Sequence, residues 1–500
     1  MKKNLDVRRR KQAKFNLDFA MCCLFLPPIE RDRAEKKMGT VCQEPPPLIR
    51  DIKVTVHDTS LVFPADPIPN EPFFLSNIDK VLNFDVQTIH FFPAHVEFTP
   101  DRVAERLKDA LARILVHYKF LSGRLRLDAM TRQLQIECNS EGVGFVVASS
   151  ECGLDDIGDL VYPNPAFERL VTKSMDILQH DNQPLGIVQV TSFTCGGFAM
   201  GISANHATFD GLSFKMFLQN LAALAADKPL AVEPCNDRRL LAARSPPRVS
   251  FPHPERLKLN VPQGQDASRP LVFTDAPEEL DFKIFKLSPK DIARLKEKAA
   301  KDAGGLDSSY PKARVTSFNV VTAHIWRCKA LSSCTDADDG GSKSRSSTLL
   351  YAVDIRPRLE PPLPRGYTGN AVLTAYATAT RGELEEWPLG RLVEMVTEGA
   401  GRMTDEYARS AIDWGEVNMG FPHGEVLVSS WWRLGFADVE YPWGRPRYSC
   451  PLVYRRKDII LLVPDMVTAS QNGGDGVNVL VALPGPEMAK FQSLFHKSLT

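Results

Sequence analysis

The sequence lacks a surplus of charge of either sign and lacks any long apolar run. Lysine and arginine number 61, as do aspartate and glutamate, so the formal net charge is zero. A balanced charge gives no reason to expect nucleic acid or an anionic membrane as a partner. No apolar run reaches the roughly 20 residues that a membrane-spanning helix needs, so we expect no membrane span.

The ten cysteines show none of the spacings that bind metal. There is no C-x-x-C pair and no cysteine–histidine cluster with zinc spacing, which argues against the common zinc sites. A chain of 500 residues needs no disulfide framework, so we expect reduced thiols and a cytoplasmic protein. A phosphate-binding G-x-x-x-x-G-K-[ST] loop is also missing, so ATP use is not indicated.

The first residues loosely imitate a secretory signal. Several lysines and arginines precede a short apolar stretch at 19–26, but Asp18 interrupts the approach and no small-x-small cleavage site follows. Met38 is a candidate second start. We therefore expect residues 1–47 to be a disordered extension, and whether residues 1–37 belong to the mature protein stays open.

The length predicts two domains, because 500 residues exceed what one hydrophobic core usually organises. Residues 228–270 contain many prolines and charges and no clean period, which indicates a long surface crossover. We therefore predict an N-terminal domain over 48–227 and a C-terminal domain over 271–500, both of mixed α/β structure.

The apolar periodicity predicts individual elements in both halves. The predicted strands lie at 54–62, 78–84, 88–92 and 281–287, and a run of strands split by Gly196-Gly197 is predicted over 187–204. The predicted helices lie at 100–121, 212–225 and 288–303, and a hairpin is predicted from LRLD to QLQIEC.

The strongest local signal is the segment Asn205-His206-Ala207-Thr208-Phe209-Asp210-Gly211, which follows an apolar strand. A neutral imidazole at a strand end suits proton transfer near pH 7. Asp210 suits fixing of the loop, and Gly211 lets the chain turn into the next helix. The pattern alone is short and common by chance, so by itself it favours a polar residue at a strand end without catalytic function.

Several further segments, in order along the chain, change that balance. The His206 segment resembles the HxxxDG motif of the BAHD acyltransferases, a plant family that uses coenzyme A thioesters. VHYKFLSGRLRLD, TSFNVVTAHIWRCKA, VDIRPRLEPPLPRGYTGN and VLVSSWWRL resemble other family segments. The resemblance covers nearly the whole chain from about residue 48.

This resemblance implies a fold, an activity and partners. The fold is α/β, with two similar-sized mixed-sheet domains of the chloramphenicol acetyltransferase-like type, a long crossover and a tunnel between the domains. The activity is acyl transfer from acyl-coenzyme A, as co-substrate, to a small-molecule alcohol or amine. The resemblance implies a monomer with no permanently bound cofactor and no metal.

The resemblance also assigns roles to individual residues. His206 is the expected general base, and Asp210 is expected to orient its loop. Ser429 and the Trp431 indole N–H are the candidate oxyanion donors. Residues Tyr367, Gly369 and Asn370 are expected in a loop near coenzyme A. His324 is expected to be a core histidine rather than a second base.

The second family signature, Asp-Phe-Gly-Trp-Gly, is altered here to Glu440-Tyr441-Pro442-Trp443-Gly444. The family's aspartate pairs with an arginine, which we match to Arg356. We therefore expect Glu440 to pair with Arg356, with Asp438 as a second candidate. Pro442 replaces a glycine and fixes φ, so the loop must differ locally.

Three other functions fit the sequence less well. A degraded second signature occurs in non-catalytic relatives that act as partner proteins in lipid elongation. Carrier-dependent dihydrolipoyl or chloramphenicol acyltransferases place HxxxDG near the C-terminus, whereas His206 lies mid-chain. A plain binding module would leave the combination of motifs unexplained. The acyl donor and the acceptor stay open, with hydroxycinnamoyl-type members the most similar overall.

Overall fold

The structure is a computed structural model that describes residues 51–259, 278–303, 315–333, 343–452, 456–465, 476–497 and 499. The predicted extension at 1–47 and the candidate start at Met38 lie outside the described residues. So does the end of the predicted crossover, because residues 260–277 are not described.

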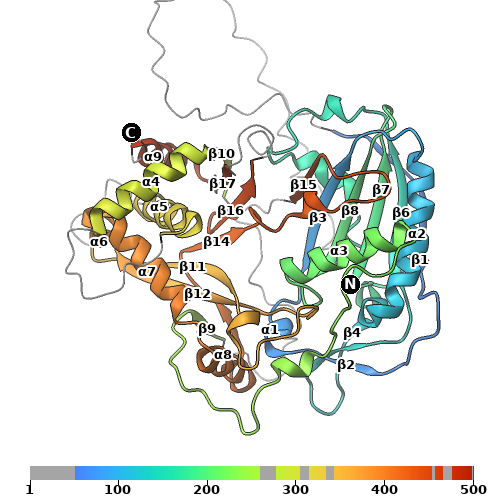
Figure 1. Ribbon diagram of the computed structural model, residues 1–500, viewed down its shortest axis with the longest axis horizontal. Coiled ribbons are helices and arrows are strands. Elements are labelled where there is room, and N and C mark those ends of the chain that lie inside the picture. The colour runs from blue at the N-terminus through green and yellow to red at the C-terminus, as the bar shows by residue number, and fades with distance from the viewer. Residues whose placement is uncertain are drawn as a thin grey trace, which may run out of the picture. The chain divides into compact units, whose positions relative to one another are not determined.

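The first of two large sheets is built mainly from the N-terminal half of the chain (Figure 1). In spatial order its strands are β1 (Val54–Val62), β6 (Val143–Ser150), β7 (Gly186–Ser192), β8 (Phe198–Asn205), β3 (Asp85–Phe92) and β15 (Tyr448–Pro451). β6 and β7 run parallel and the other neighbours are antiparallel, so the sheet is mixed.

The amphipathic helix α2 (Pro100–His117) and the mostly buried helix α3 (Gly211–Ala225) pack together against this sheet. Thr99 caps α2 and Pro100 occupies its first turn, where a missing N–H costs nothing. Val103, Leu107 and Leu111 lie four residues apart and are buried, as their spacing predicts.

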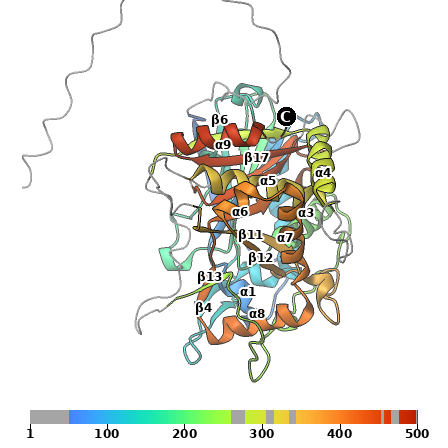
Figure 2. The ribbon, with the colours of Figure 1, turned by 90° about the vertical axis from the view of Figure 1, so that its left-hand side faces the viewer.

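The second large sheet comes from the C-terminal half. In spatial order its strands are β10 (Asp281–Leu287), β17 (Val477–Leu483), β16 (Ile459–Pro464), β14 (Val426–Ser430), β11 (Ser346–Asp354) and β12 (Val372–Thr380). Figure 2 shows helices in front of this sheet, namely α4 (Pro289–Ala303), α5 (Ser317–Ser332), α6 (Arg381–Glu386), α7 (Leu389–Gly401) and α9 (Gly485–Lys497). Helix α8 (Asp405–Val417) lies beside the small ladder of β9 (Arg256–Lys258) and β13 (Gly420–Pro422), where the Arg256 guanidinium carbon is 5.3 Å from the centre of the Trp414 ring (Figure 1).

The chain therefore has the predicted α/β class with two mixed sheets, and this prediction is confirmed. One strand crosses between the halves, because β15 pairs with β3 and places Cys450 opposite Ile89. The boundaries at 48–227, 228–270 and 271–500 stay a prediction. Among the described residues no helix is both long and apolar enough to cross a bilayer.

Two predicted elements are wrong. The strand predicted at 78–84 is instead a short helix, α1 (Asn77–Lys80), followed by a turn. Ser76 and Asp79 form a capping box there, and this local polar pairing overrides the apolar run. The helix predicted at 100–121 ends at His117, and a 3₁₀ turn (Lys119–Ser122) follows.

The predicted surface crossover is also partly wrong. Its described part contributes Arg238, Leu241, His253 and Glu255 to the interior, each at most 2% exposed. The segment was predicted as exposed because it is rich in charge. The polar groups among them are paired when buried: Arg238 contacts Asp79, and the His253 ring bonds Glu255.

Candidate active site

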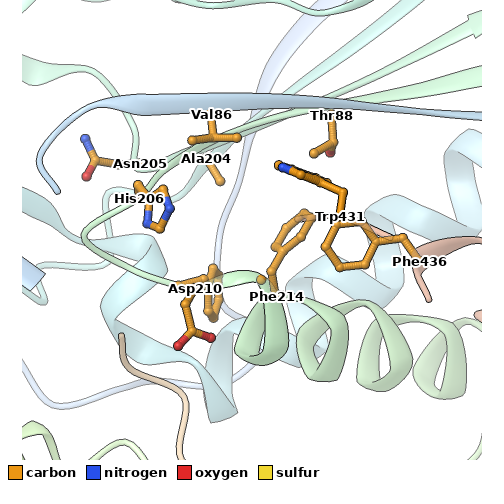
Figure 3. Close-up of a pocket in the computed structure, with 11 residues that line it drawn as sticks. Val86, Thr88, Ala204, Asn205, His206, Asp210, Phe214, Trp431 and Phe436 are labelled. Carbon is orange, nitrogen blue, oxygen red and sulfur yellow. The ribbon is translucent and has the colours of Figure 1, made fainter. Parts of the chain in front are cut away.

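His206 lies immediately after β8 and faces a pocket with mostly apolar walls (Figure 3). Its lining residues are Val86, Thr88, Ala204, Asn205, His206, Phe209, Asp210, Gly211, Phe214, Trp431 and Phe436. The strand end therefore delivers the imidazole to a cavity, as its position in the sequence predicts.

The main chain of His206 is held on both sides. Its N–H donates to the Phe84 carbonyl at 2.8 Å, and its carbonyl accepts from Asn370 Nδ2 at 2.8 Å. The ring lies 5.3 Å from the Phe84 ring between centroids. Burial lowers the pKa of the imidazole below its ordinary value, against smaller opposing effects from its own backbone and from Asp210. The ring is therefore neutral at pH 7.

Asp210 points away from the imidazole and holds the turn into α3 (Figure 3). Its Oδ1 accepts from the main-chain N–H groups of Leu212 and Ser213 at 3.1 and 2.9 Å, which caps the helix. Its Oδ2 accepts from the Ala371 N–H at 2.9 Å and lies 2.8 Å from Arg356 Nη2. The Asp210 carboxylate therefore stabilises the conformation of the loop and does not bind the His206 ring.

Arg356 pairs with Asp210, so the predicted pairing with Glu440 or Asp438 is wrong. The guanidinium also contacts Asp354 at 3.1 Å and donates to the Gly369 carbonyl at 2.8 Å. Burial alone would lower the pKa of Arg356, but Asp210 and Asp354 outweigh it and raise the pKa. Glu440 is bound instead to Arg445, its near neighbour in sequence, at 2.9 Å on the surface.

A second buried ion pair, which the sequence patterns did not reveal, lies on the other side of the motif loop. Asp79 in α1 and Arg238 in the crossover are 3.4 Å apart, with side chains 0% and 1% exposed. The guanidinium also packs near the rings of Phe73 and Phe120. No motif marks either residue, and only the fold brings them together.

The segment Tyr367 to Asn370 is buried between these two ion pairs. The Tyr367 ring lies 5.8 Å from both the Arg238 and the Arg356 guanidinium carbons. At Gly369 an added Cβ would lie 2.1 Å from Arg238 Nη1, so only glycine fits. Asn370 is fully buried and bonds Asp79 and His206. Contact of this segment with coenzyme A stays a prediction.

Of the two candidate oxyanion donors, Trp431 lines the pocket with His206, and its indole points into the cavity (Figure 3). The ring stands edge-on to Phe436 at 5.4 Å, and its main-chain N–H donates to the Leu462 carbonyl. Ser429 is half-buried in β14, opposite Leu461 of β16, and is not among the described lining residues.

The altered second signature forms a tight turn. Tyr441 and Gly444 exchange both main-chain hydrogen bonds, at 3.1 and 2.9 Å, with Pro442 and Trp443 between them. Gly444 has φ of 97°, which favours glycine. Trp443 is buried against Phe92 and Phe198. The turn accommodates the fixed φ of Pro442, and Trp443 anchors an aromatic cluster, whereas Glu440 makes no pair with Arg356.

Sequence reasoning also missed the opposite pocket wall. Thr88 lines the pocket, and its Oγ1 lies 3.3 Å from His90 Nε2, while His90 Nδ1 lies 2.9 Å from Ser449 Oγ in β15. Burial lowers the pKa of His90 to about 3, so it stays neutral. The alternation of Val86, Thr88 and His90 along one strand is the sequence signal that could have placed Thr88 on the pocket side.

Over the described residues no group of three or more His, Cys, Asp or Glu is arranged to hold a metal.

The sequence and the fold are both similar to those of known acyltransferases. The family model described as "Transferase family" matches residues 52–498. Acyltransferase GLAUCE of Arabidopsis thaliana is 56% identical over 464 residues, which are 92% of this chain and all of the relative. Fatty alcohol:caffeoyl-CoA acyltransferase of the same plant is 33% identical over 453 residues, covering 89% of this chain and 98% of the relative.

Among solved structures, that of vinorine synthase matches with a TM-score of 0.65 and 23% identity, covering 89% of this chain and all of that chain. At this identity the match supports the fold. The family match over most of the chain and the named relatives show that the chain belongs to the Transferase family, that is, to the BAHD acyltransferases.

Proposed function

We propose that this acyltransferase moves an acyl group from an acyl-coenzyme A donor to a hydroxyl or amine, with neutral His206 as general base. The observation that carries the proposal is the position of His206. It stands at a strand end on an apolar pocket, with its main chain fixed on both sides and its pKa lowered by burial. A neutral imidazole is the form that accepts a proton.

The proposed reaction follows from these positions. Because His206 Nδ1 is buried, we assign the proton transfer to Nε2. The acceptor oxygen or nitrogen attacks the thioester carbonyl as its proton passes to the ring. The tetrahedral oxyanion is stabilised by the Trp431 indole N–H, with Ser429 as a further candidate donor. Collapse breaks the carbon–sulfur bond, and the imidazolium returns the proton to the coenzyme A thiolate.

The pocket walls favour an apolar or aromatic acyl group. Phe209, Phe214, Trp431 and Phe436 contribute four aromatic rings to the lining. Flat apolar groups pack well against such rings. The name of one relative, fatty alcohol:caffeoyl-CoA acyltransferase, agrees with this chemistry. We therefore propose a hydroxycinnamoyl-type or related acyl donor, and a plant alcohol or amine as acceptor, handled by a monomer in the cytoplasm.

The test is a panel of donors and acceptors with the purified full-length chain. Coenzyme A release is followed with acetyl-, malonyl-, fatty acyl- and hydroxycinnamoyl-CoA, each with and without a mixture of long-chain alcohols and amines. We expect release that needs both substrates and is fastest with hydroxycinnamoyl donors. Release independent of acceptor would indicate a thioesterase instead. Fastest release with acetyl- or malonyl-CoA would refute the donor class.

A matched pair of variants tests the oxyanion assignment. Trp431→Phe removes the indole N–H and keeps most of the ring, so kcat should fall about a hundredfold, as for loss of one such donor. Trp432→Phe is the control, because Trp432 is buried nearby but is not among the described lining residues. Equal kcat for both variants would remove Trp431 from the mechanism.

The alternative of a non-catalytic partner protein is not favoured by the family match and the named relatives.

A further inference from the structure

Three largely inaccessible side chains, of which Asn370 and Arg238 are fully buried and Arg356 is 11% exposed, hold alternate residues of the HxxxDG loop. Asn370 Nδ2 donates to the His206 carbonyl at 2.8 Å. Arg238 Nη2 donates to the Thr208 carbonyl at 2.8 Å. Arg356 pairs with the Asp210 carboxylate at 2.8 Å. The loop is thus fixed at each second residue by a group from elsewhere in the chain.

Asp79 joins the first two of these side chains. Its Oδ1 accepts from both the main-chain N–H and the Nδ2 of Asn370, at 3.1 and 2.8 Å, and lies 3.4 Å from Arg238 Nη1. Its Oδ2 accepts from the Ser76 hydroxyl at 2.7 Å. We name Asp79, Arg238 and Asn370 the carbonyl clamp. All three residues are at most 2% exposed.

The side chains of Arg238 and Asn370 in the clamp donate hydrogen bonds to main-chain carbonyls of the HxxxDG loop. Asn370 uses its side-chain N–H groups twice, while its Oδ1 is buried and has no hydrogen-bond partner among the described residues. An unsatisfied buried acceptor is costly, so this orientation is maintained by the contacts that the amide makes as a donor. Arg238 likewise spans from Asp79 to Thr208.

Three separate parts of the chain supply the clamp. Asp79 comes from α1, Arg238 from the crossover and Asn370 from the loop before β12. Stability alone does not require such a cluster, since apolar residues of similar volume often serve as well as a buried ion pair. Catalysis does require an accurately placed base, because a displacement of about 1 Å in a catalytic group costs on the order of a hundredfold in rate.

We propose that Asp79, Arg238 and Asn370 are positioning residues, which set the His206 imidazole by fixing the carbonyls at 206 and 208. This inference rests on the proposed role of His206 as base. It makes the geometry of the base depend on contacts from both halves of the chain, because Asn370 follows the second sheet's β11 and Asp79 precedes β3.

The test compares two buried asparagines. Asn370→Ala removes the donor to His206. Asn220→Ala is the matched control, because Asn220 is also fully buried. Its side chain bonds Tyr118 Oη and the main-chain N–H and carbonyl of Val232, at 2.8 to 2.9 Å, and makes no hydrogen bond to the motif loop. We expect similar losses of Tm, but only Asn370→Ala should lower kcat, by about ten- to a hundredfold.

A second readout reports the ring itself. The ¹³C-labelled His206 imidazole should change its NMR shift in Asn370→Ala and keep it in Asn220→Ala. If Asn370→Ala does not fold, Arg238→Lys serves, since it keeps a charge for Asp79 and loses the fork that reaches Thr208. Wild-type kcat in either folded clamp variant, or equal kcat loss in Asn220→Ala, would overturn the inference. Wild-type activity in His206→Ala would instead overturn the proposed function.

Discussion

Replacing Arg356 by methionine tests the buried ion pair on which the HxxxDG loop depends. Asp210 is 4% exposed and would lose its only charged partner among the described residues, keeping its main-chain N–H donors. Leaving a buried carboxylate without its cation costs about 3 to 5 kcal/mol. Because the main-chain N–H groups of α3 and of Ala371 still bind the carboxylate, we expect a loss in the free energy of unfolding near the lower end of this range, about 3 kcal/mol. Urea unfolding followed by tryptophan fluorescence measures it.

Glu440→Gln is the matched control for this prediction. Glu440 and Arg445 are 66% and 59% exposed, so their pair should contribute less than about 1 kcal/mol. Combining Arg356→Met with Asp210→Asn should recover about 2 kcal/mol, because the amide still caps α3 without a buried charge. A loss in Glu440→Gln as large as in Arg356→Met would refute the reasoning and restore the Glu440 pairing.

Three further predictions concern pH and packing. Because burial lowers the pKa of His206, the acid limb of kcat/KM should lie below pH 6.5, and a limb above that value in a pH–rate profile would contradict the account. Burial lowers the pKa of His324 to about 3, so from pH 6.5 downward the unfolded state binds more protons and stability falls by about 1.4 kcal/mol per pH unit. His324→Leu should reduce that slope in unfolding experiments between pH 7 and 5, whereas an unchanged slope would show that His324 does not titrate this way. Gly369→Ala should lower the Tm strongly, because the new Cβ meets Arg238 at 2.1 Å, while Gly401→Ala, with no atom within 4 Å, should leave it unchanged or raise it. Similar Tm values for the two alanine variants would show that the loop at 369 relaxes freely.

Local signals explain what the sequence predicts well. The position of His206 follows from an apolar strand that ends in a polar turn, and Asp210 caps the next helix as its type and place indicate. The two mixed sheets follow from the resemblance and from the strand patterns. Pocket lining by Trp431 agrees with its place just after β14.

Partners far apart in sequence explain what the sequence does not predict. The sequence offers Arg356 several possible carboxylate partners, among them Glu440 and Asp438, and only the packed structure selects Asp210, 146 residues away. Asp79 and Arg238 are separated by 159 residues, and neither belongs to a motif. Strand propensity failed at α1 because the capping box of Ser76 and Asp79 fixes a helical turn.

The central claim is that neutral His206 is the base for direct acyl transfer. Its most direct test is the single-turnover rate of His206→Ala, at saturating donor and acceptor, with the Tm and the donor Kd measured alongside. The account predicts a rate at least about a hundredfold below wild type, with Tm and donor Kd retained. A rate within tenfold of wild type would contradict it.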